Sequence, residues 1–140
     1  MEKDRIIRDM VCRPSSVAVV GASRSPGRPV SGVMAYLADS GFLLFPVNPA
    51  YAGEKILGME CYERLVDLPQ KVDIVAFFVA AKNQETVLND LGDIGYKPVI
   101  WMQPGAENPD AESRLRSEGY AVFSGACLMM THRTDCAARD

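Results

Sequence analysis

Continuous apolar runs recur along the chain and predict buried strands. They cover residues 16–21, 42–49, 72–80, 98–103 and 120–124. Because apolar and polar positions do not alternate within them, these runs are typical of parallel strands that are covered on both faces of a sheet. The clearest is VDIVAFFVA at 72–80.

Segments with helical spacing of apolar residues lie between these runs. Residues 2–12 predict a short amphipathic helix that ends before Pro14, and residues 50–68 predict a loop, a short extended piece and one helical turn. Capping residues bound the other helices. We expect helices over 30–41, 83–95 with Asn83 as the cap, and 108–119 with Asn108 as the cap.

This alternation of strands and helices predicts an α/β fold with a doubly wound, mostly parallel sheet in three layers. We expect a single domain over residues 1–140, with its core at 15–133 and a loose tail at 134–140. Ligands of such sheets bind outside the carboxyl ends of the strands, where the strand order reverses. The segments to search are therefore 21–28, 46–49, 79–82 and 103–106.

The turn after the first strand has the composition of a phosphate-binding turn. Gly21 allows a sharp turn, and the following helix directs free N–H groups and its positive dipole end toward it. Ser23 can donate a hydroxyl, and Arg24 or Arg28 can add a charge-assisted contact to phosphate. The alternative is a plain tight turn with two solvated arginines.

Common nucleotide fingerprints are missing at this turn. The loop reads GASRSPGR instead of GxGxxG, and the second strand ends in Val47-Asn48-Pro49, with no carboxylate for a ribose. NAD is therefore disfavoured, and NADP would need an arginine for its additional phosphate. The P-loop pattern is also absent, so ATP hydrolysis is not expected.

Several blocks together resemble a known family. VAVVGAS, YLADSGFLLFPVNP, ILGMECY, LPQKVDIVAFFV and PVIWMQPGA, followed by Cys127 and His132, occur in the order found in small CoA-binding proteins. These are stand-alone relatives of the Rossmann-like CoA-binding domain of succinyl-CoA synthetase α subunits and NDP-forming acyl-CoA synthetases. The resemblance covers roughly residues 12 to 133.

The resemblance implies that coenzyme A, or an acyl-CoA, lies across the carboxyl edge of the sheet. The glycine turn would meet the diphosphate, the second strand end the adenosine, and the third strand end the adenine or pantetheine arm. Lys55 is assigned to the 3′-phosphate from its charge and position alone. The implied contacts are Gly21, Ala22, Ser23, Arg24 or Arg28, Asn48, Pro49, Lys55, Val79, Ala80, Ala81, and, on the far side, Gln103, Pro104 and Gly105.

Two blocks depart from the family pattern. Family members often carry an arginine after the third long strand, and an Asp-Arg pair before the cysteine. This chain has Val79-Ala80-Ala81 and Gly125-Ala126 at these positions. The pocket wall is accordingly expected to carry less charge.

The charge balance excludes some partners. With 15 basic and 18 acidic residues and no long run of like charge, the chain is not expected to bind nucleic acid or an anionic membrane. The N-terminus mixes both charges where a signal peptide has an apolar stretch, so we expect a cytoplasmic protein.

The cysteines are widely scattered, at Cys12, Cys61, Cys127 and Cys136. Without closely paired ligands a metal site is not expected, and in a reducing cytosol all four would be free thiols. Cys127 and the sole histidine, His132, could form a nucleophile and base pair. The simpler interpretation is that Cys127 is a small buried residue and that His132 lies at the surface or caps a helix.

The sequence therefore predicts binding of CoA or an acyl-CoA without catalysis, in a carrier, sensor or regulatory module. One alternative is an NADP-linked oxidoreductase or redox sensor. Another is a partner-binding module with a vestigial pocket. The amphipathic segment 2–12 could also serve a homodimer or an unidentified protein partner.

Overall fold

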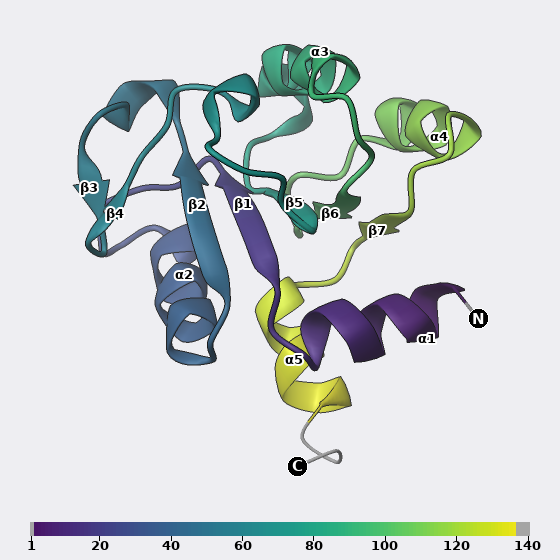
Figure 1. The fold of residues 1–140 in the computed structure, drawn as a ribbon, viewed down its shortest axis with the longest axis horizontal. Helices are drawn as coiled ribbons and strands as arrows, with labels where there is room; N and C mark the ends of the chain where they lie inside the picture. Colours follow the sequence, from purple (N-terminus) through teal and green to yellow (C-terminus); the bar gives the residue numbers. More distant parts are fainter. Residues whose placement is uncertain (1, 137–140) are drawn as a thin grey trace.

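The sheet consists of five parallel strands in residues 2–136, which are the residues that the computed structural model describes. The strand order is β2-β1-β5-β6-β7 (Figure 1). All five predicted strands are confirmed, although each is shorter than the apolar run that predicted it. Their bounds are Ser16–Val20 (β1), Leu43–Val47 (β2), Ile74–Phe77 (β5), Val99–Met102 (β6) and Val122–Ser124 (β7).

Helices cover both faces of this sheet, as the doubly wound prediction requires (Figure 1). Buried side chains form one core between the sheet and α2 and α5, and a second between the sheet and α3 and α4. The layers are therefore helix, sheet and helix. The helices are α1 (Glu2–Ile6), α2 (Pro29–Asp39), α3 (Glu85–Asp93), α4 (Pro109–Ser117) and α5 (Leu128–Asp135), and α1 continues into a π-helical segment, η1 (Ile7–Val11).

The segment between β2 and β5 contains short elements. A turn of 3₁₀ helix, η2 (Pro49–Tyr51), leads into a small antiparallel hairpin of β3 (Lys55–Ile56) and β4 (Met59–Glu60). A second turn, η3 (Leu65–Asp67), precedes β5. This agrees with the predicted loop, extended piece and helical turn.

The start of α3 differs from the prediction. Asn83 does not cap it; residues Ala81–Asn83 form a 3₁₀ turn, η4, and Gln84 occupies the N-cap position. Gln84 is fully buried, and its Nε2 donates to the carbonyl oxygens of Val79 and Ala106, at 2.9 and 2.8 Å. Its Oε1 accepts from Asn108 Nδ2 at 2.9 Å. The side chain thus joins the β5–α3 connection to the β6–α4 connection, and the 3₁₀ turn η4 directs it inward.

The outer strands of the sheet have partners for outward-facing backbone groups. Pro46, in β2, has no N–H, and its carbonyl accepts from the N–H of Tyr62 at 2.9 Å. On β7, the carbonyl of Val122 accepts from the guanidinium of Arg116 at 3.1 Å.

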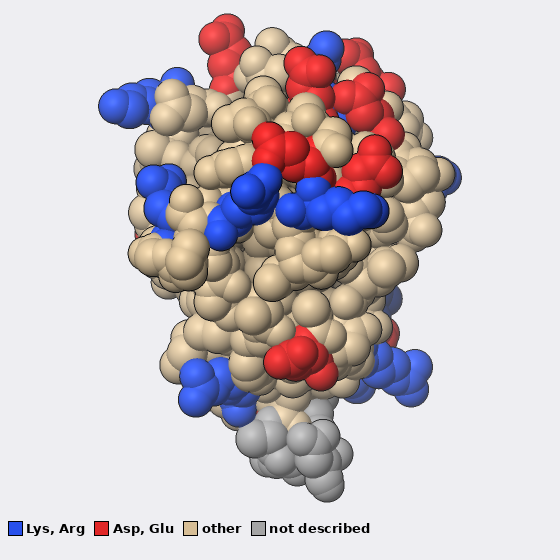
Figure 2. All heavy atoms as spheres, turned by 90° about the vertical axis from the view of Figure 1, so that its left-hand side faces the viewer, with Lys and Arg blue, Asp and Glu red and all other residues tan. Residues whose placement is uncertain are grey.

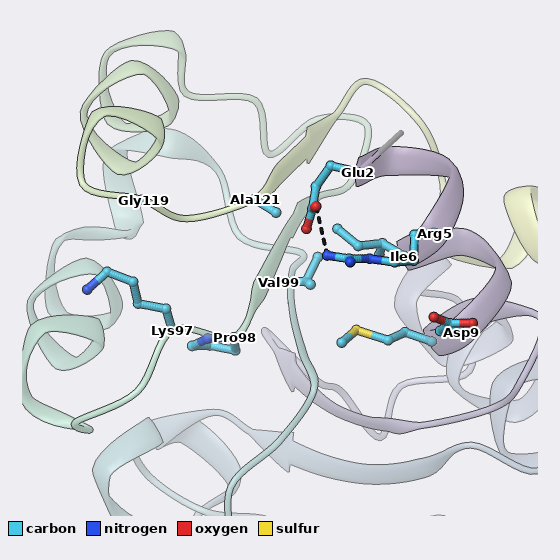
Figure 3. A pocket seen from close by; sticks show the side chains of 10 residues that line it. Glu2, Arg5, Ile6, Asp9, Lys97, Pro98, Val99, Gly119 and Ala121 are labelled. Carbon is cyan, nitrogen blue, oxygen red and sulfur yellow. Dashed lines mark hydrogen bonds and ion pairs between the residues drawn. The ribbon is translucent and has the colours of Figure 1, made fainter.

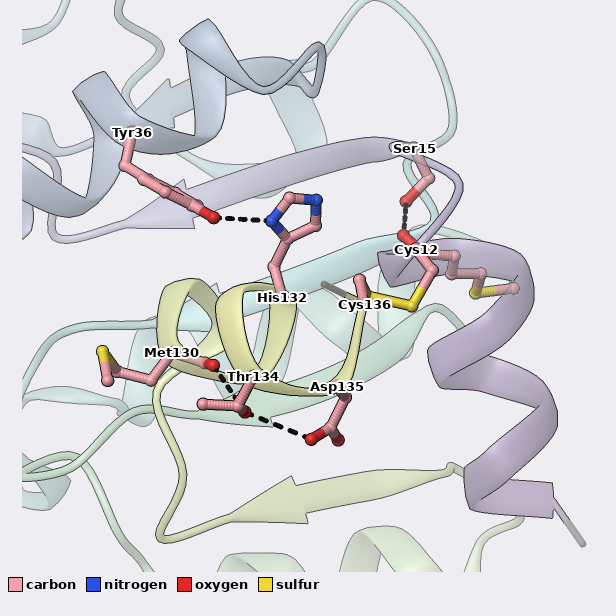
Figure 4. Close-up of a disulfide and its surroundings, with 9 residues drawn as sticks. Cys12, Ser15, Tyr36, Met130, His132, Thr134, Asp135 and Cys136 are labelled. Carbon is pink, nitrogen blue, oxygen red and sulfur yellow. Dashed lines mark hydrogen bonds between the residues drawn. A yellow bond between two sulfur atoms is a disulfide. The ribbon is translucent and has the colours of Figure 1, made fainter. Parts of the chain in front are cut away.

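The prediction of four free thiols is wrong for two of them. Cys12 and Cys136 form a disulfide between the end of η1 and the end of α5 (Figure 4), whereas Cys61 and Cys127 are free. The two bonded residues are 124 positions apart, so their spacing gives no signal. Only the packing of the N-terminal segment beside α5 brings them together.

The C-terminal segment is also more ordered than expected at its start. Helix α5 includes Thr134 and Asp135, and Cys136 is buried; the rest of the predicted tail, 137–140, lies outside the described residues. Within residues 2–136, no helix has the length and apolar character needed to cross a bilayer.

Candidate functional site

The strand order reverses between β1 and β5. From β1 the chain crosses to β2 on one side, and later strands continue on the other side of β1. The carboxyl ends of β1, β2 and β5 therefore meet at the switch point, where ligands of wound sheets bind. Gly21, Asn48 and Val79 line one hollow there, of about 160 Å³.

Gly21 is required by close packing at this point. Its φ is +94°, a conformation that side chains disfavour, and a Cβ built on it would lie 2.8 Å from Cγ1 of Val79. Its N–H donates to the carbonyl of Val47 at 2.9 Å. The glycine thus lets the turn after β1 lie directly against the chain leaving β5.

Serine hydroxyls organise the turn between β1 and α2. Ser23 is buried, and its Oγ accepts from the N–H of Ser25 at 3.0 Å. Ser31, in the first turn of α2, donates to the carbonyls of Ser23 and Ser25, at 3.2 and 2.6 Å. The loop is therefore held by its own hydroxyls at the N-terminus of an eleven-residue helix.

Tyr51 completes this loop and was not predicted. Hydrogen bonds with Ser23 and Ser25 lower the pKa of Tyr51, and the positive charges of Arg24 and Arg28 act in the same direction. The serines and arginines of the turn thus favour the negatively charged form of a group placed beside them. Tyr51 follows Asn-Pro-Ala directly, but nothing in that spacing shows that η2 lies against the serine turn.

Asn48 has a structural role at this edge. Its Nδ2 donates to the carbonyl of Ala22 at 2.8 Å, and its Oδ1 accepts from the N–H of Ala50 at 2.9 Å. The side chain ties the turn after β1 to the turn after β2. Because both of its polar atoms are engaged, it is not free to replace the ribose-binding carboxylate of dinucleotide sites.

A wider groove lies between the start of α2 and the β3–β4 hairpin. It has a volume of about 490 Å³, and Ser23, Arg24 and Lys55 line it. Arg24 forms an ion pair with Glu54 across this region. On this face of the molecule, basic and acidic side chains adjoin one another (Figure 2). The groove therefore offers cations to an anionic ligand without forming a purely basic surface.

The smaller hollow has a charged wall. Asp90, on α3, is fully buried and accepts from Arg64 at 2.5 and 3.3 Å. The hydrogen bonds to Asp90 and the negative charge of its carboxylate raise the pKa of Arg64. The remaining wall is mainly apolar, with Val20, Val47 and Val87.

The far end of the edge is closed by Gln103. This side chain is buried; its Oε1 accepts from the N–H of Leu128 at 2.8 Å, and its Nε2 lies 3.2 Å from Sγ of Cys127. Cys127 is half-buried. His132 is partly exposed, as expected, but it does not act as a helix cap: its Nδ1 lies 2.7 Å from the hydroxyl of Tyr36, and its ring packs edge-on against Phe42. The two side chains thus have separate partners and do not form a nucleophile and base pair.

The predicted contact residues fall into three groups. Gly21, Asn48, Pro49 and Val79 line the smaller hollow, and Ser23, Arg24 and Lys55 line the groove. The third group follows the same strand ends but lines neither of the two: Ala22, Arg28, Ala80, Ala81, Gln103, Pro104 and Gly105.

Comparison with known families identifies the family of this chain. Residues 15–133 match the model of the CoA binding domain. The chain belongs to the CoA-binding domain family. It shares the Rossmann-like fold of that family, and the resemblance seen in the sequence is confirmed.

Relatives of this CoA-binding domain chain include free-standing proteins and parts of larger enzymes. The uncharacterized protein YneT of Bacillus subtilis is 29% identical over 126 residues, which cover 90% of this chain and 91% of YneT. An ADP-forming acetate-CoA ligase II of Archaeoglobus fulgidus is 36% identical over 94 residues, 66% of this chain. These make up 14% of the ligase, so the chain spans a small part of that enzyme's length.

Solved structures support the same family. A hypothetical protein from Pyrococcus horikoshii OT3 has a TM-score of 0.83 and 34% identity, with 93% of this chain and 89% of that chain covered. The protein ID.343 from Thermus thermophilus has a TM-score of 0.85 and 32% identity, with 93% and 96% covered.

Proposed function

We propose that this protein binds coenzyme A or an acyl-CoA across the carboxyl edge of its sheet and acts as a non-catalytic carrier, sensor or regulatory module. The observation that carries the proposal is the position of the serine turn, at the strand-order reversal of a CoA-binding domain. The turn lies at the N-terminus of α2, beside the hydroxyl of Ser23. The positive end of a helix dipole and a hydroxyl both suit a diphosphate.

The cations around the turn support a ligand with several phosphates. Arg24 and Lys55 line the groove beside the turn, and Arg28 precedes the first residue of α2. All three side chains are exposed, so they can reorient toward a ligand. In this arrangement Ser23 and the backbone meet the diphosphate, and Lys55 meets the 3′-phosphate.

The smaller hollow suits an uncharged part of the same ligand. Its valine walls can pack against a flat ring or an alkyl arm, and the strand ends at Pro49 and Val79 border it. Without the family arginine at 79–81, the part of the wall formed by Val79 is apolar, while Arg64 and Asp90 form a charged part. The apolar part is consistent with the proposed adenine or pantetheine contact.

Calorimetric titration of the reduced protein with CoA tests the proposal, with 3′-dephospho-CoA, NAD and NADP as comparators. We expect micromolar binding of CoA, weaker binding of dephospho-CoA, and none of NAD. Tight binding of NADP alone would favour the oxidoreductase alternative. No binding of any of the four would contradict the proposal and favour a protein partner.

Lys55→Ala should weaken CoA binding by about tenfold, because one charge-assisted contact to phosphate is removed. Its affinity for dephospho-CoA should stay unchanged, since that ligand lacks the group that Lys55 contacts. Lys71→Ala serves as the matched control. Lys71 is exposed and precedes the amino end of β5, whereas the proposed site lies at the carboxyl end of that strand. Equal weakening of both ligands by Lys55→Ala would place the 3′-phosphate elsewhere.

Tyr51 offers a spectroscopic test of the same turn. In the free protein its phenolate should form at a lower pH than that of an ordinary tyrosine, because Ser23 and Ser25 hydrogen-bond to it. A bound diphosphate brings negative charge and neutralises Arg24 and Arg28, so CoA should raise this pKa. Titration of phenolate absorbance measures the change, and Tyr51→Phe identifies the signal. A pKa that does not respond to bound CoA would contradict binding at this turn.

A further inference from the structure

The N-terminal segment lies over the amino ends of two strands and is incompletely packed there. We call residues 2–12 the strap. Between the strap and the starts of β6 and β7 is a hollow of about 230 Å³, with Glu2, Arg5 and Asp9 on the strap side and Lys97 and Pro98 on the sheet side (Figure 3). The hollow lies at the amino ends of the strands, whereas the proposed CoA site lies at their carboxyl ends.

The non-covalent contacts between the strap and the body of the protein are mainly apolar. Among its described residues, only Ile6 and Val11 are buried, and Ile7 and Met10 are partly buried and pack against the same core. Its ion pairs, Arg5 with Glu2 and Arg8 with Asp9, join strap residues to one another. Lys3 lies over the ring of Phe123, 5.6 Å from its centre. A helix this short, half of it π-helical, is not stable alone in water.

The disulfide supplies the covalent attachment. It joins Cys12, the last residue of the strap, to Cys136 at the end of α5 (Figure 4). Beside it, the hydroxyl of Ser15 donates to the carbonyl of Met10 at 2.8 Å. Cys12 is half-buried and Cys136 is buried, so Cys12 is the more accessible residue of the pair.

The other thiols are poorly placed to exchange with this bond. Burial raises the pKa of Cys61, which lies after β4. Cys127 is at the opposite end of α5 from Cys136, about 13 Å away along a helix of that length. The bond therefore opens through an external thiol.

We propose that the strap is redox-gated. A dithiol attacks Sγ of Cys12 as a thiolate, which breaks the bond to Cys136 and leaves a mixed disulfide. The second thiol of the reductant then releases Cys12. Two electrons and two protons pass to the protein, giving two thiols, and the dithiol becomes a disulfide. Without the bond, the strap is held by the apolar contacts of Ile6, Ile7, Met10 and Val11 and by the hydrogen bond from Ser15. It therefore opens more often, which uncovers the amino ends of β6 and β7.

Limited trypsin digestion of the native protein, with and without a dithiol, tests the proposal. Arg5 and Arg8 are exposed on the strap and report its opening. Intact mass after quenching should show strap cleavage about tenfold faster in the reduced protein, because local opening controls cleavage. Cleavage after Arg24, in the exposed loop before α2, should not change and serves as an internal control.

Variants separate the disulfide from other effects of the reductant. Trypsin should cleave the strap of Cys12→Ser as fast as that of the reduced protein, whether or not dithiol is present. Cys61→Ser should behave as the unaltered protein. Thiol titration in denaturant should find two free thiols before reduction and four afterwards. Four free thiols in the air-oxidised protein, or equal strap cleavage in both redox states, would overturn the proposal. Neither readout uses CoA, so the result is independent of the proposed function.

Discussion

Replacing Gln84 with alanine should lower the free energy of unfolding by about 3 kcal/mol, because buried carbonyls lose their donor and a cavity remains. The affected groups are the carbonyls of Val79 and Ala106 and the amide of Asn108, which caps α4. Denaturant unfolding measures the change. Since the three partners lie on two connections at the ligand edge, β5–α3 and β6–α4, we also expect the loops after β5 and β6 to exchange amide hydrogens faster.

Two comparisons make this prediction specific. Gln84→Met keeps most of the volume and removes the hydrogen bonds, so it should still cost about 2 kcal/mol. Gln70→Ala alters an exposed glutamine and should change stability by less than about 0.5 kcal/mol. If Gln84→Met were as stable as the unaltered protein, the hydrogen-bond argument would fail and packing alone would explain the loss in Gln84→Ala.

Gly21→Val should destabilise the fold by about 4 kcal/mol, through a positive φ and contact with Val79. Cβ of the new residue would lie 2.8 Å from Cγ1 of Val79 and 3.3 Å from the backbone carbon of Phe78. Chemical denaturation measures the loss. CoA binding would also fall in this variant, but as a consequence of the damaged turn.

A double variant distinguishes the two causes. Gly21→Ala with Val79→Ala removes the contact with Cγ1 but keeps the strained φ, so it should be less harmful than the sum of its single changes. Gly92→Ala is the control, because Gly92 lies in α3 and a Cβ there would have no heavy atom within 4 Å, and alanine favours a helix by about 1 kcal/mol. Strict additivity of the pair would show that the contact with Val79 contributes nothing.

Local patterns predicted the fold well because they are set within each element. The five apolar runs became β1, β2, β5, β6 and β7, and Asn108 caps α4 as its position before Pro109 indicated. The edge that carries the candidate site followed from the strand order. The family resemblance, carried by several blocks in order, is confirmed over residues 15–133.

What the sequence did not show depends on which distant segments meet. Gln84 looked like an ordinary residue near a helix start, yet it joins the β5–α3 connection to the β6–α4 connection. Asn48 was predicted as a ligand contact, and nothing in the sequence indicated that its side chain also ties two turns together. Tyr51 and the partner of Cys12 became visible only when the loops and the chain ends were placed in space. The contacts of the proposed site with CoA stay predictions.

The two outer strands also bear on how copies of this protein can associate. Strand addition needs a row of unpaired donors and acceptors along a sheet margin. On β2, Pro46 offers no donor and Tyr62 occupies its acceptor; on β7, Arg116 occupies the acceptor of Val122. Both margins are thereby blunted against continuous intermolecular pairing. These features oppose strand addition at both margins, so we expect self-association to use helices or loops instead.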